Sequence, residues 1–381
     1  MKLPKSPMRS QDADRYARHH LIDGFDQDRL QKADLIVVGA GAVGNEVLKN
    51  LALLGVGKIE IHDFDLIEEN NLTRSILFRA EHIGQSKAVV AAEACCAIDS
   101  NVKATAFEGD FRDRLTLERL QASDAVLCCV DNFEARIALN RLCLLARTPL
   151  YNAAIDAREV AVEVYPHQLR QAAACYECWI PAAIYEDINQ RQSCGGLRKA
   201  SIEQRRIPTT TLTSSFAGAA MVSLVFQQLC NLPGRRTTSV QARAQLMSLT
   251  AVEHAIRHNP ACPACETFAR DRVILPCRAD SPILSGESTT ANDPLLRFSE
   301  PLLTGWSCTG CNSSREMFSL ARHCDTSLLW CPKCCAETRT ARILDKATAT
   351  TLATLAAGRR LPLTYLIDET ITPPVVLSIN Q

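Results

Sequence analysis

The sequence predicts an α/β protein with a doubly wound, mostly parallel sheet, an antiparallel extension of that sheet, and a small C-terminal unit that contains a zinc ribbon. Three observations predict this fold. Apolar strand-like runs alternate with helical segments between residues 34 and 147, a glycine-rich loop follows the first of those runs, and four C-x-x-C pairs lie beyond residue 170. Regular alternation of strands and helices is typical of a parallel sheet covered by helices on both faces.

The first strand is expected at residues 34–39, where a short apolar run ends in glycine. The segment 45–57 has helical periodicity and is stopped by two glycines. The alternating run KIEIHDFD predicts the second strand at residues 58–65. A helix, a strand and a helix are then expected at 84–98, 124–130 and 133–147, which completes a Rossmann-like series.

The pattern changes after residue 150. Residues 151–181 include alternating segments such as REVAVEVYP, which are typical of antiparallel strands, and residues 209–231 are expected to form an apolar core helix. The polar stretch 185–208 between them is expected to be irregular. Residues 278–300 are rich in Ser, Pro, Asp and Thr, which predicts a linker. We therefore expect one unit at 1–277, the linker at 278–300 and a second unit at 301–381.

Composition excludes several classes of function. Lys plus Arg and Asp plus Glu both number 42 in 381 residues, so the chain as a whole is not expected to capture nucleic acid electrostatically. We found no apolar run near the roughly 18–20 residues of a membrane span, and no apolar secretory core near the start. A cytoplasmic protein is expected. In that reducing compartment, the 18 cysteines are expected to be metal ligands or catalysts rather than disulfides.

Gly39, Gly41 and Gly44 form a G-x-G-x-x-G loop between the first strand and the first helix. Such a loop lets backbone N–H groups approach a phosphate at a helix N-terminus. Asp63 lies 19 residues after Gly44, where its carboxylate can accept hydrogen bonds from ribose hydroxyls. These residues predict a nucleotide site. An NAD-dependent dehydrogenase is the default interpretation, and a glycine turn without a ligand is the alternative.

Arg74 and Lys87 supply two cations that hydride transfer does not need. A triphosphate site does need them, because charge develops on the bridging and leaving oxygens. Asp131 follows a predicted strand and is placed to hold Mg²⁺, which prefers one or two carboxylates together with phosphate oxygens. The alternative is that both cations are solvated surface charges. The pattern favours ATP and Mg²⁺ over a nicotinamide dinucleotide.

The run from Arg15 to about Leu232 resembles the ThiF/MoeB/ubiquitin-activating superfamily of adenylyltransferases. The resemblance rests on motifs in that family's order and spacing, namely Arg15-Tyr16-Ala17-Arg18, the glycine loop, Asp63-Phe64-Asp65, Asn71-Leu72-x-Arg74, Gly84-x-x-Lys87 and Asp131-Asn132. It implies an ATP pocket shaped by the three glycines, ribose binding by Asp63, Mg²⁺ binding by Asp131, and phosphate contacts from Asn71, Arg74 and Lys87. Ser75 departs from the family, which often has Gln there.

The resemblance also implies a reaction and an assembly. The family joins the C-terminal carboxylate of a small β-grasp protein to AMP. Two anions meet when that carboxylate approaches the α-phosphate, so cationic side chains and Mg²⁺ would offset the repulsion and stabilise the departing pyrophosphate. Arg18 is implied to reach the ATP of a neighbouring subunit, so a homodimer is expected.

Two groups of cysteines have the spacing of zinc ligands. Cys175/Cys178 and Cys262/Cys265 are two knuckles that can give four thiolates to Zn²⁺, and relatives carry the same pair around the crossover segment. Cys308-x2-Cys311-x19-Cys331-x2-Cys334 has the spacing of a zinc ribbon, with Cys335, Cys324 and His323 as competing ligands. We expect two structural Zn²⁺ sites. The alternative for the first group is four unrelated buried thiols.

Cys194 has no C-x-x-C partner and lies in the polar stretch RQSCGGLRK, whose cations favour the thiolate. Its position corresponds to the crossover-loop cysteine of the family, so it is a candidate nucleophile that would carry an acyl group as a thioester. A loop cysteine without a catalytic role is the alternative. Six further cysteines lie in apolar periodic segments and are expected to be small core hydrophobes: Cys95, Cys96, Cys128, Cys129, Cys143 and Cys230.

Three functions compete. The Cys194-Gly195-Gly196 segment and the ribbon look most like stand-alone bacterial ubiquitin-activating-like enzymes, which are encoded with a ubiquitin-like protein and a conjugating enzyme in antiphage operons. The leading hypothesis is adenylation of a ubiquitin-like protein, thioester formation on Cys194 and transfer to a conjugating enzyme. The runner-up is a sulfur-carrier-protein adenylyltransferase of the thiamine or molybdopterin type. A catalytically silent scaffold is the third, and the retained Arg18, Arg74, Lys87 and Asp131 argue against it.

Overall fold

The computed structural model describes residues 15–169, 174–186, 209–268, 274–277, 293–323, 330–335, 339–356, 359, 361–370 and 374–379. Eight strands form the first sheet, in the order β3-β2-β1-β4-β5-β6-β7-β8. The first five in that order run parallel, and β6, β7 and β8 continue the sheet antiparallel. The predicted fold class is therefore confirmed. The strands are β1 Asp34–Val38, β2 Lys58–Asp63, β3 Lys103–Glu108, β4 Ala125–Cys128, β5 Leu150–Ile155, β6 Glu159–Tyr165, β7 Val240–Gln245 and β8 Thr250–Ala255.

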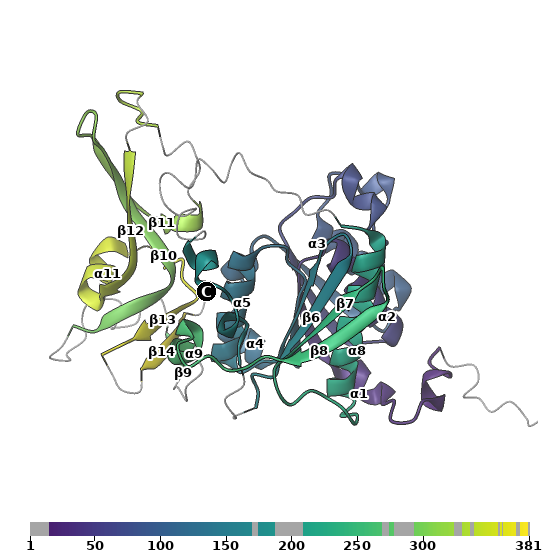
Figure 1. Ribbon diagram of the computed structural model, residues 1–381. Helices are drawn as coiled ribbons and strands as arrows, with labels where there is room; N and C mark the ends of the chain where they lie inside the picture. The colour runs from purple at the N-terminus through teal and green to yellow at the C-terminus, as the bar shows by residue number, and fades with distance from the viewer. Residues whose placement is uncertain are drawn as a thin grey trace, which may run out of the picture.

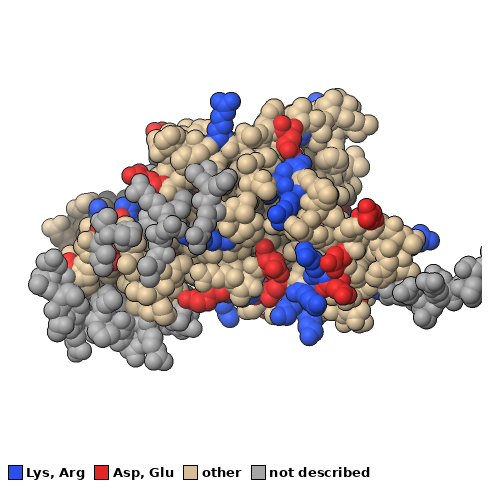
Figure 2. Space-filling model, turned by 90° about the horizontal axis from the view of Figure 1, so that it is seen from below, with Lys and Arg blue, Asp and Glu red and all other residues tan. Residues whose placement is uncertain are grey.

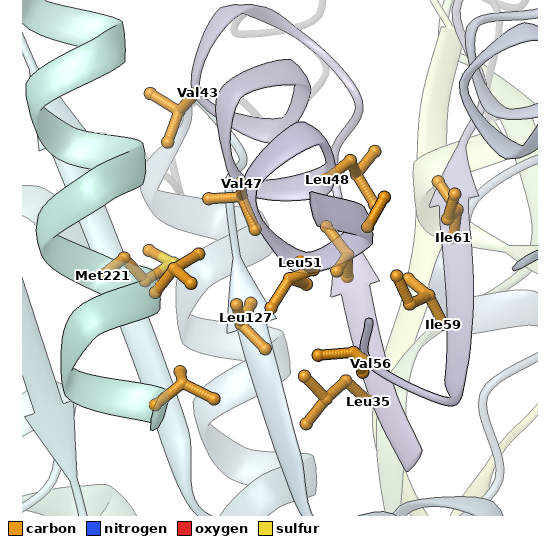
Figure 3. Packing of buried hydrophobic residues seen from close by; sticks show 14 of the residues in the cluster. Leu35, Val43, Val47, Leu48, Leu51, Val56, Ile59, Ile61, Leu127 and Met221 are labelled. Carbon is orange, nitrogen blue, oxygen red and sulfur yellow. The ribbon is translucent and has the colours of Figure 1, made fainter. Parts of the chain in front are cut away.

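Helices cover both faces of this sheet (Figure 1). The apolar sides of α2, α3 and α8 pack on one face, and α4 and α5 lie on the other, between the sheet and the C-terminal unit. Figure 3 shows the first of these layers, where Val47 and Leu51 of α2 point toward Leu127 and Leu35 of the strands. The helices are α1 Gln27–Lys32, α2 Ala42–Leu54, α3 Lys87–Ile98, α4 Leu117–Gln121, α5 Phe133–Ala146, α8 Thr211–Leu229 and α9 Pro263–Phe268.

Helix α8 lies against α2, and their closest approach requires a glycine. A Cβ on Gly218 would stand 2.5 Å from Glu46 Cβ. By length and composition alone, α8 could cross a membrane, which corrects the expectation that no apolar run has that length. Its apolar side chains Met221 and Val225 are buried in the core on the sheet. A helix of this kind is weak support for a membrane span.

The second sheet has six strands, in the order β11-β10-β13-β14-β9 with β12 beside β10. All its pairs are antiparallel except β14 with β9. Helix α11, Ala349–Ala356, packs on it through Leu352, which is fully buried. The strands are β9 Ile274–Cys277, β10 Leu295–Cys308, β11 Ser314–Leu320, β12 Arg339–Thr348, β13 Tyr365–Asp368 and β14 Val375–Ile379.

This sheet corrects one end of the predicted linker at 278–300. Strand β10 begins at Leu295, so residues 295–300 are strand. Leu296 and Phe298 alternate into the core, but the surrounding Ser, Pro and Asp residues hide that alternation in the sequence. Strand β9, which we placed with the first unit, pairs with β14 of the second sheet. The division of the chain into units remains a prediction, and we call the second sheet with its helix α11 the C-terminal unit.

Figure 2 shows one face of the molecule, where Lys and Arg side chains alternate with Asp and Glu. No patch of one sign dominates the described part of that face. This distribution agrees with the zero formal net charge of the chain.

Candidate active site

Two glycines of the loop are required by the backbone, and the third faces open space. Gly39 has φ +96°, and a Cβ on Gly44 would stand 2.0 Å from the Gly39 carbonyl oxygen. A Cβ on Gly41 would meet no atom within 4 Å. Gly41 is the N-cap of α2, and no side chain of the described residues caps that end. The first turn of α2 therefore keeps N–H groups that an anion can bind.

Asp63, the last residue of β2, joins this loop to the segment after the strand. Its Oδ2 accepts a hydrogen bond from Ala40 N at 2.6 Å, and its Oδ1 accepts one from Asp65 N at 2.8 Å. Burial raises the pKa of Asp63, although these two hydrogen bonds and the Lys87 charge oppose that rise. A carboxylate held in this way is fixed at the carboxyl end of the parallel sheet.

Lys87, the first residue of α3, lies beside the same segment. Its Nζ is 2.7 Å from Asp65 Oδ2, and its backbone N donates to Asp65 O at 3.0 Å. The ammonium is nearly buried, whereas the Asp65 carboxylate is half exposed. The structure thus brings Asp63, Asp65 and Lys87 together. An anion that displaced Asp65 would find a desolvated cation.

Asn71 and Arg74 lie in the 3-10 turn Glu69–Thr73 and just after it. Asn71 is buried and accepts a hydrogen bond from Glu68 N at 3.0 Å, so its side chain builds the turn. The Arg74 guanidinium donates to Asn70 O at 2.6 Å. Ser75, the departure from the family pattern, is also buried. The phosphate contacts predicted for Asn71 and Arg74 remain predictions.

Asp131 follows β4, which is the neighbour of β1 on the side away from β2. Asn132 caps α5 by accepting a hydrogen bond from Ala135 N at 2.8 Å, and it donates weakly to Asp131 at 3.4 Å. Asp131 itself is exposed. Because β2, β1 and β4 are adjacent and parallel, Asp63, the glycine loop and Asp131 follow the carboxyl ends of neighbouring strands, where ligands of such sheets bind.

Sequence reasoning missed a buried polar chain behind this edge. Arg136 donates to Val130 O at 2.5 Å and to Asn152 Oδ1 at 2.5 Å. Asn152 donates in turn to Glu163 at 2.7 Å. All three side chains are buried, and the chain holds the backbone that carries Asp131. The only signal in the sequence was one arginine on the apolar face of a predicted helix.

The N-terminal motif is anchored away from the glycine loop. The Tyr16 hydroxyl bonds to the Asp99 carboxylate, and Arg15 Nε lies 3.2 Å from the same group. Burial, with help from Asp99, raises the pKa of Tyr16 to about 12. Arg18 is exposed just before a short 3-10 helix. Its predicted reach into a neighbouring subunit remains a prediction.

The first cysteine group converges as predicted. Cys178 ends the 3-10 turn Tyr176–Cys178 and Cys175 is the residue before that turn. Cys265 lies in α9 and Cys262 is the residue before that helix. The Sγ atoms of Cys175 and Cys262 are 3.6 Å apart, and those of Cys178 and Cys265 are 3.5 Å apart. Tetrahedral Zn²⁺ with bonds of about 2.3 Å needs sulfurs about 3.8 Å apart. Four buried thiols at this spacing fit Zn²⁺.

The second group also converges, at the tip of the second sheet. Cys308 lies 3.6 Å from Cys334, and Cys311 lies 3.6 Å from Cys331, measured between Sγ atoms. A hydrogen bond from Ser313 is the main reason that the pKa of Cys331 falls to about 5, which favours the thiolate. All four sulfurs lie within 4.8 Å of one another. Of the competing ligands, Cys335 and His323 are outside this group, and Cys324 is outside the described residues.

Two other predictions about cysteines have different outcomes. Cys194 lies outside the described residues. Cys96 is exposed, which corrects its assignment to the core. It lies on α3 directly after the buried Cys95, so it falls off the apolar stripe of that helix. Cys129 is half buried, and Cys95, Cys128, Cys143 and Cys230 are buried as expected.

The family model for ThiF matches residues 14–266. The chain belongs to the ThiF family. Among curated relatives, it is 35% identical over 170 residues to adenylyltransferase and sulfurtransferase MOCS3-1 of Zea mays, which covers 44% of this chain and 36% of the maize protein. It is 36% identical over 170 residues to SUMO-activating enzyme subunit 2 of Dictyostelium discoideum, across 44% of this chain and 25% of that protein.

A third relative is the sulfur carrier protein adenylyltransferase of Thermus thermophilus, 32% identical over 176 residues, or 45% of this chain and 65% of that protein. The chain therefore spans about a quarter to two thirds of these relatives. Among solved structures, E. coli MccB with ATP has a TM-score of 0.55 at 21% identity, covering 69% of this chain and 77% of MccB. At that identity, the likeness concerns the fold alone.

Proposed function

We propose that this ThiF-family chain uses ATP to adenylate the C-terminal carboxylate of a ubiquitin-like protein. One observation carries the proposal: the glycine loop, Asp63, Lys87 and Asp131 all stand at the carboxyl edge of one parallel sheet in a member of this family. A carboxylate oxygen attacks the α-phosphorus of ATP. The bond from that phosphorus to the bridging oxygen breaks, and pyrophosphate leaves with both electrons of the bond.

Each residue has a place in this reaction. The open side of Gly41 and the uncapped start of α2 bind phosphate, and Asp63 accepts hydrogen bonds from the ribose. Lys87 leaves Asp65 to neutralise the phosphates, and Arg74 and Asn71 are further phosphate contacts in this proposal. Arg18 reaches the site from the second subunit of a homodimer. Mg²⁺ on Asp131 supplies charge neutralisation when it is bound.

The acyl group then moves to sulfur. The thiolate of Cys194 attacks the carbonyl carbon of the acyl-adenylate, a C–S bond forms, and AMP leaves with the oxygen. A conjugating enzyme takes the group from this thioester. We place the reaction in the cytoplasm and in antiphage defence, because the Cys194-Gly195-Gly196 segment and the ribbon resemble the enzymes of such operons.

The two four-cysteine groups fit structural Zn²⁺ and need no part in the chemistry. The first lies in the core that contains α5 and fixes the two knuckles on either side of the stretch that contains Cys194. The second lies in the C-terminal unit, outside the matched residues. We assign it a docking or stabilising role, because Trp330 beside it is exposed.

The test is intact-mass measurement under denaturing, non-reducing conditions after incubation with Mg·ATP and each ubiquitin-like protein of the source genome. We expect an adduct that thiols remove, absent in Cys194→Ala and retained in Cys96→Ala, the matched exposed cysteine. Pyrophosphate without any adduct would exclude Cys194 as the acceptor. No pyrophosphate with any of these proteins would overturn the adenylation itself.

The runner-up is activation of a sulfur carrier protein. The names of two relatives state adenylation of a sulfur carrier protein and activation of SUMO, so relatives of similar identity favour each candidate. Both share the AMP step and differ after it. Release of pyrophosphate with a sulfur carrier, and no thioester on Cys194, would make the runner-up the better assignment.

A further inference from the structure

A cluster of ion pairs joins the C-terminal unit to the turn that follows β3 in the first sheet. Arg322 lies in the 3-10 helix Ala321–His323 after β11. Its Nη2 is 2.5 Å from Asp113 Oδ1, its Nη1 is 3.5 Å from Asp110 Oδ2, and its Nε is 2.6 Å from Glu300 Oε2. The Arg322 side chain is only 9% exposed. One guanidinium therefore bridges a carboxylate of its own sheet and two carboxylates of the turn after β3.

Arg112 extends the cluster from that turn toward α5. It binds Asp110 Oδ2 at 2.6 Å and Glu134 Oε1 at 3.0 Å, and it lies 3.8 Å from Glu300. Glu134 is in the first turn of α5, three residues after Asp131. The C-terminal unit also holds the backbone here, because Thr364 Oγ1 donates to Arg112 O at 3.1 Å.

The other side of the same turn meets the backbone of Asp63, whose carboxylate is the proposed ribose contact. Gly109 N donates to Asp63 O at 3.3 Å, and Asp63 is paired with Glu108 in the register of β2 and β3. Residues 109–113 thus run from the strand end that carries Asp63 to the helix start that follows Asp131. Asp63 and Asp131 are both proposed nucleotide contacts. Arg322, which lies outside the residues that the family model matches, holds the turn between them.

Removal of Arg322 would leave its partners unbalanced. Burial raises the pKa of Glu300, and the charges of Arg322 and Arg112 oppose that rise. Without Arg322, Asp110 and Glu300 would share the Arg112 guanidinium in a site of low exposure, and the more exposed Asp113 would lose its arginine partner. Uncompensated buried charge is costly, and carboxylates relieve it by moving apart toward water. The turn 109–113 would move with its two aspartates.

We propose that Arg322 is a positioning residue through which the C-terminal unit sets the affinity of the nucleotide site for ATP. The inference rests on the proposed function in one respect, the identity of the nucleotide. Arg322 acts through the turn 109–113 and touches no reacting atom. The C-terminal unit is therefore part of the nucleotide site's support as well as a candidate docking unit.

The experiment measures the Kd of Mg·ATP by calorimetric titration of the full chain. Arg322→Gln and Asp113→Asn are each compared with the double variant, because a shared contact gives non-additive losses. We expect Arg322→Gln to weaken ATP binding about tenfold, which lies within the range of couplings between sites. The double variant should bind no more weakly than Arg322→Gln alone. In pyrophosphate release, the KM for ATP should rise with kcat unchanged.

The matched control is Arg297→Gln. Arg297 lies on β10, like Glu300, and its Nε is 2.5 Å from Glu369 Oε1 within the C-terminal unit. Its loss weakens that unit without touching the turn, so ATP affinity should stay within about twofold of wild type. An unchanged Kd in a folded Arg322→Gln protein would overturn the inference, as would equal weakening in Arg297→Gln.

Failure of the proposed function gives a different pattern. A wild-type chain that binds ATP but releases no pyrophosphate with any ubiquitin-like or sulfur-carrier protein would overturn adenylation, and the Kd series would still decide the role of Arg322. A wild-type chain that binds no ATP would overturn both.

Discussion

The matched region and the C-terminal unit each hold a four-cysteine group, and the two groups are built differently. All four cysteines at 175, 178, 262 and 265 are buried in a core that also contains Leu139, Leu142 and Tyr365. In the C-terminal group, Cys311 is half buried and Cys334 is exposed. Among the described residues, Trp306, Cys308 and Cys331 form its buried apolar cluster, with Cys311 and Met317 packed against them.

The difference shows what a metal would do in each place. In the matched region, the metal would join segments 84 residues apart, at Cys178 and Cys262. Both lie in the core on the α4 and α5 face of the sheet, so the stability of the sheet domain would depend on the metal. In the C-terminal unit, it would hold the tip of a sheet whose own core lies elsewhere, around Leu296 and Leu352. We therefore expect the first site to control global stability and the second to control a local surface.

The largest expected effect tests this contrast directly. Cys262→Ser should lose one of two zinc ions and lower the free energy of unfolding by more than about 4 kcal/mol, because loss of a structural metal is among the most destabilising changes. Cys331→Ser should lose the other ion and leave the main unfolding transition within about 1 kcal/mol, since the tip opens locally. Metal content by mass spectrometry and thermal unfolding measure both. Equal destabilisation by the two variants would contradict the contrast.

Much of the matched region could be predicted because its signals are local. Strands β1, β2 and β4 are apolar runs with glycine or acidic ends, and α2 and α5 have caps and stops in the expected places. Strand β3 was missed because KATAFE lies at the sheet edge and has no buried face. Strand β10 was missed at its start because two core residues stand among polar neighbours.

The second expected effect separates chemistry from stability within the matched region. Lys87→Met should lower the rate of adenylation about 10²–10³-fold, the usual loss when one preorganised charge partner is removed. Lys58→Met is the matched control, because Lys58 begins β2 at the opposite end of the sheet and lies 3.8 Å from Asp34. Pyrophosphate release at saturating ATP measures both. A Lys87→Met enzyme that kept more than a tenth of the wild-type activity would show that Lys87 has no role in the reaction.

A smaller effect distinguishes the glycines of the loop from one another. Gly41→Ala places its Cβ in open space, so the free energy of unfolding should change by less than about 1 kcal/mol. ATP affinity should nevertheless fall about tenfold, or 1.4 kcal/mol, since the methyl would occupy ligand space. Gly44→Ala should instead destabilise the fold, because its Cβ meets the Gly39 carbonyl oxygen. Unfolding measurements and ATP titrations of both variants show which glycine contacts the ligand and which one the backbone requires.

The site could be predicted less completely than the fold, because many of its contacts join residues that are far apart in the sequence. Lys87 and Asp63 belong to motifs with fixed spacing, which marked both as candidate site residues in the sequence. The Arg136–Asn152–Glu163 chain and the Arg322 cluster join residues far apart in the chain. An arginine on the apolar face of a predicted helix was the one sign of the first, and no local pattern marks the partners of either arginine.

The smallest expected effect concerns two adjacent thiols of α3 and leaves the fold unchanged. Burial raises the pKa of Cys95 from 9.0 to about 12, so at pH 8 only about one thiol in ten thousand is thiolate. Cys96 is exposed. Iodoacetamide should label Cys96 first and leave Cys95 unmodified until the protein is denatured, as peptide mass spectrometry would show.

The same pKa shift has a sign for stability. The pKa of Cys95 is higher in the folded state than in the unfolded state. The protonated thiol therefore contributes fully to the free energy of unfolding below pH 9, and this contribution is lost as the pH rises toward 12. Rapid labelling of native Cys95 at pH 8 would mean that α3 opens locally. That outcome would place the flexible part of the molecule in the matched region, next to Lys87, and would reverse the contrast between a rigid sheet domain and a locally labile C-terminal tip.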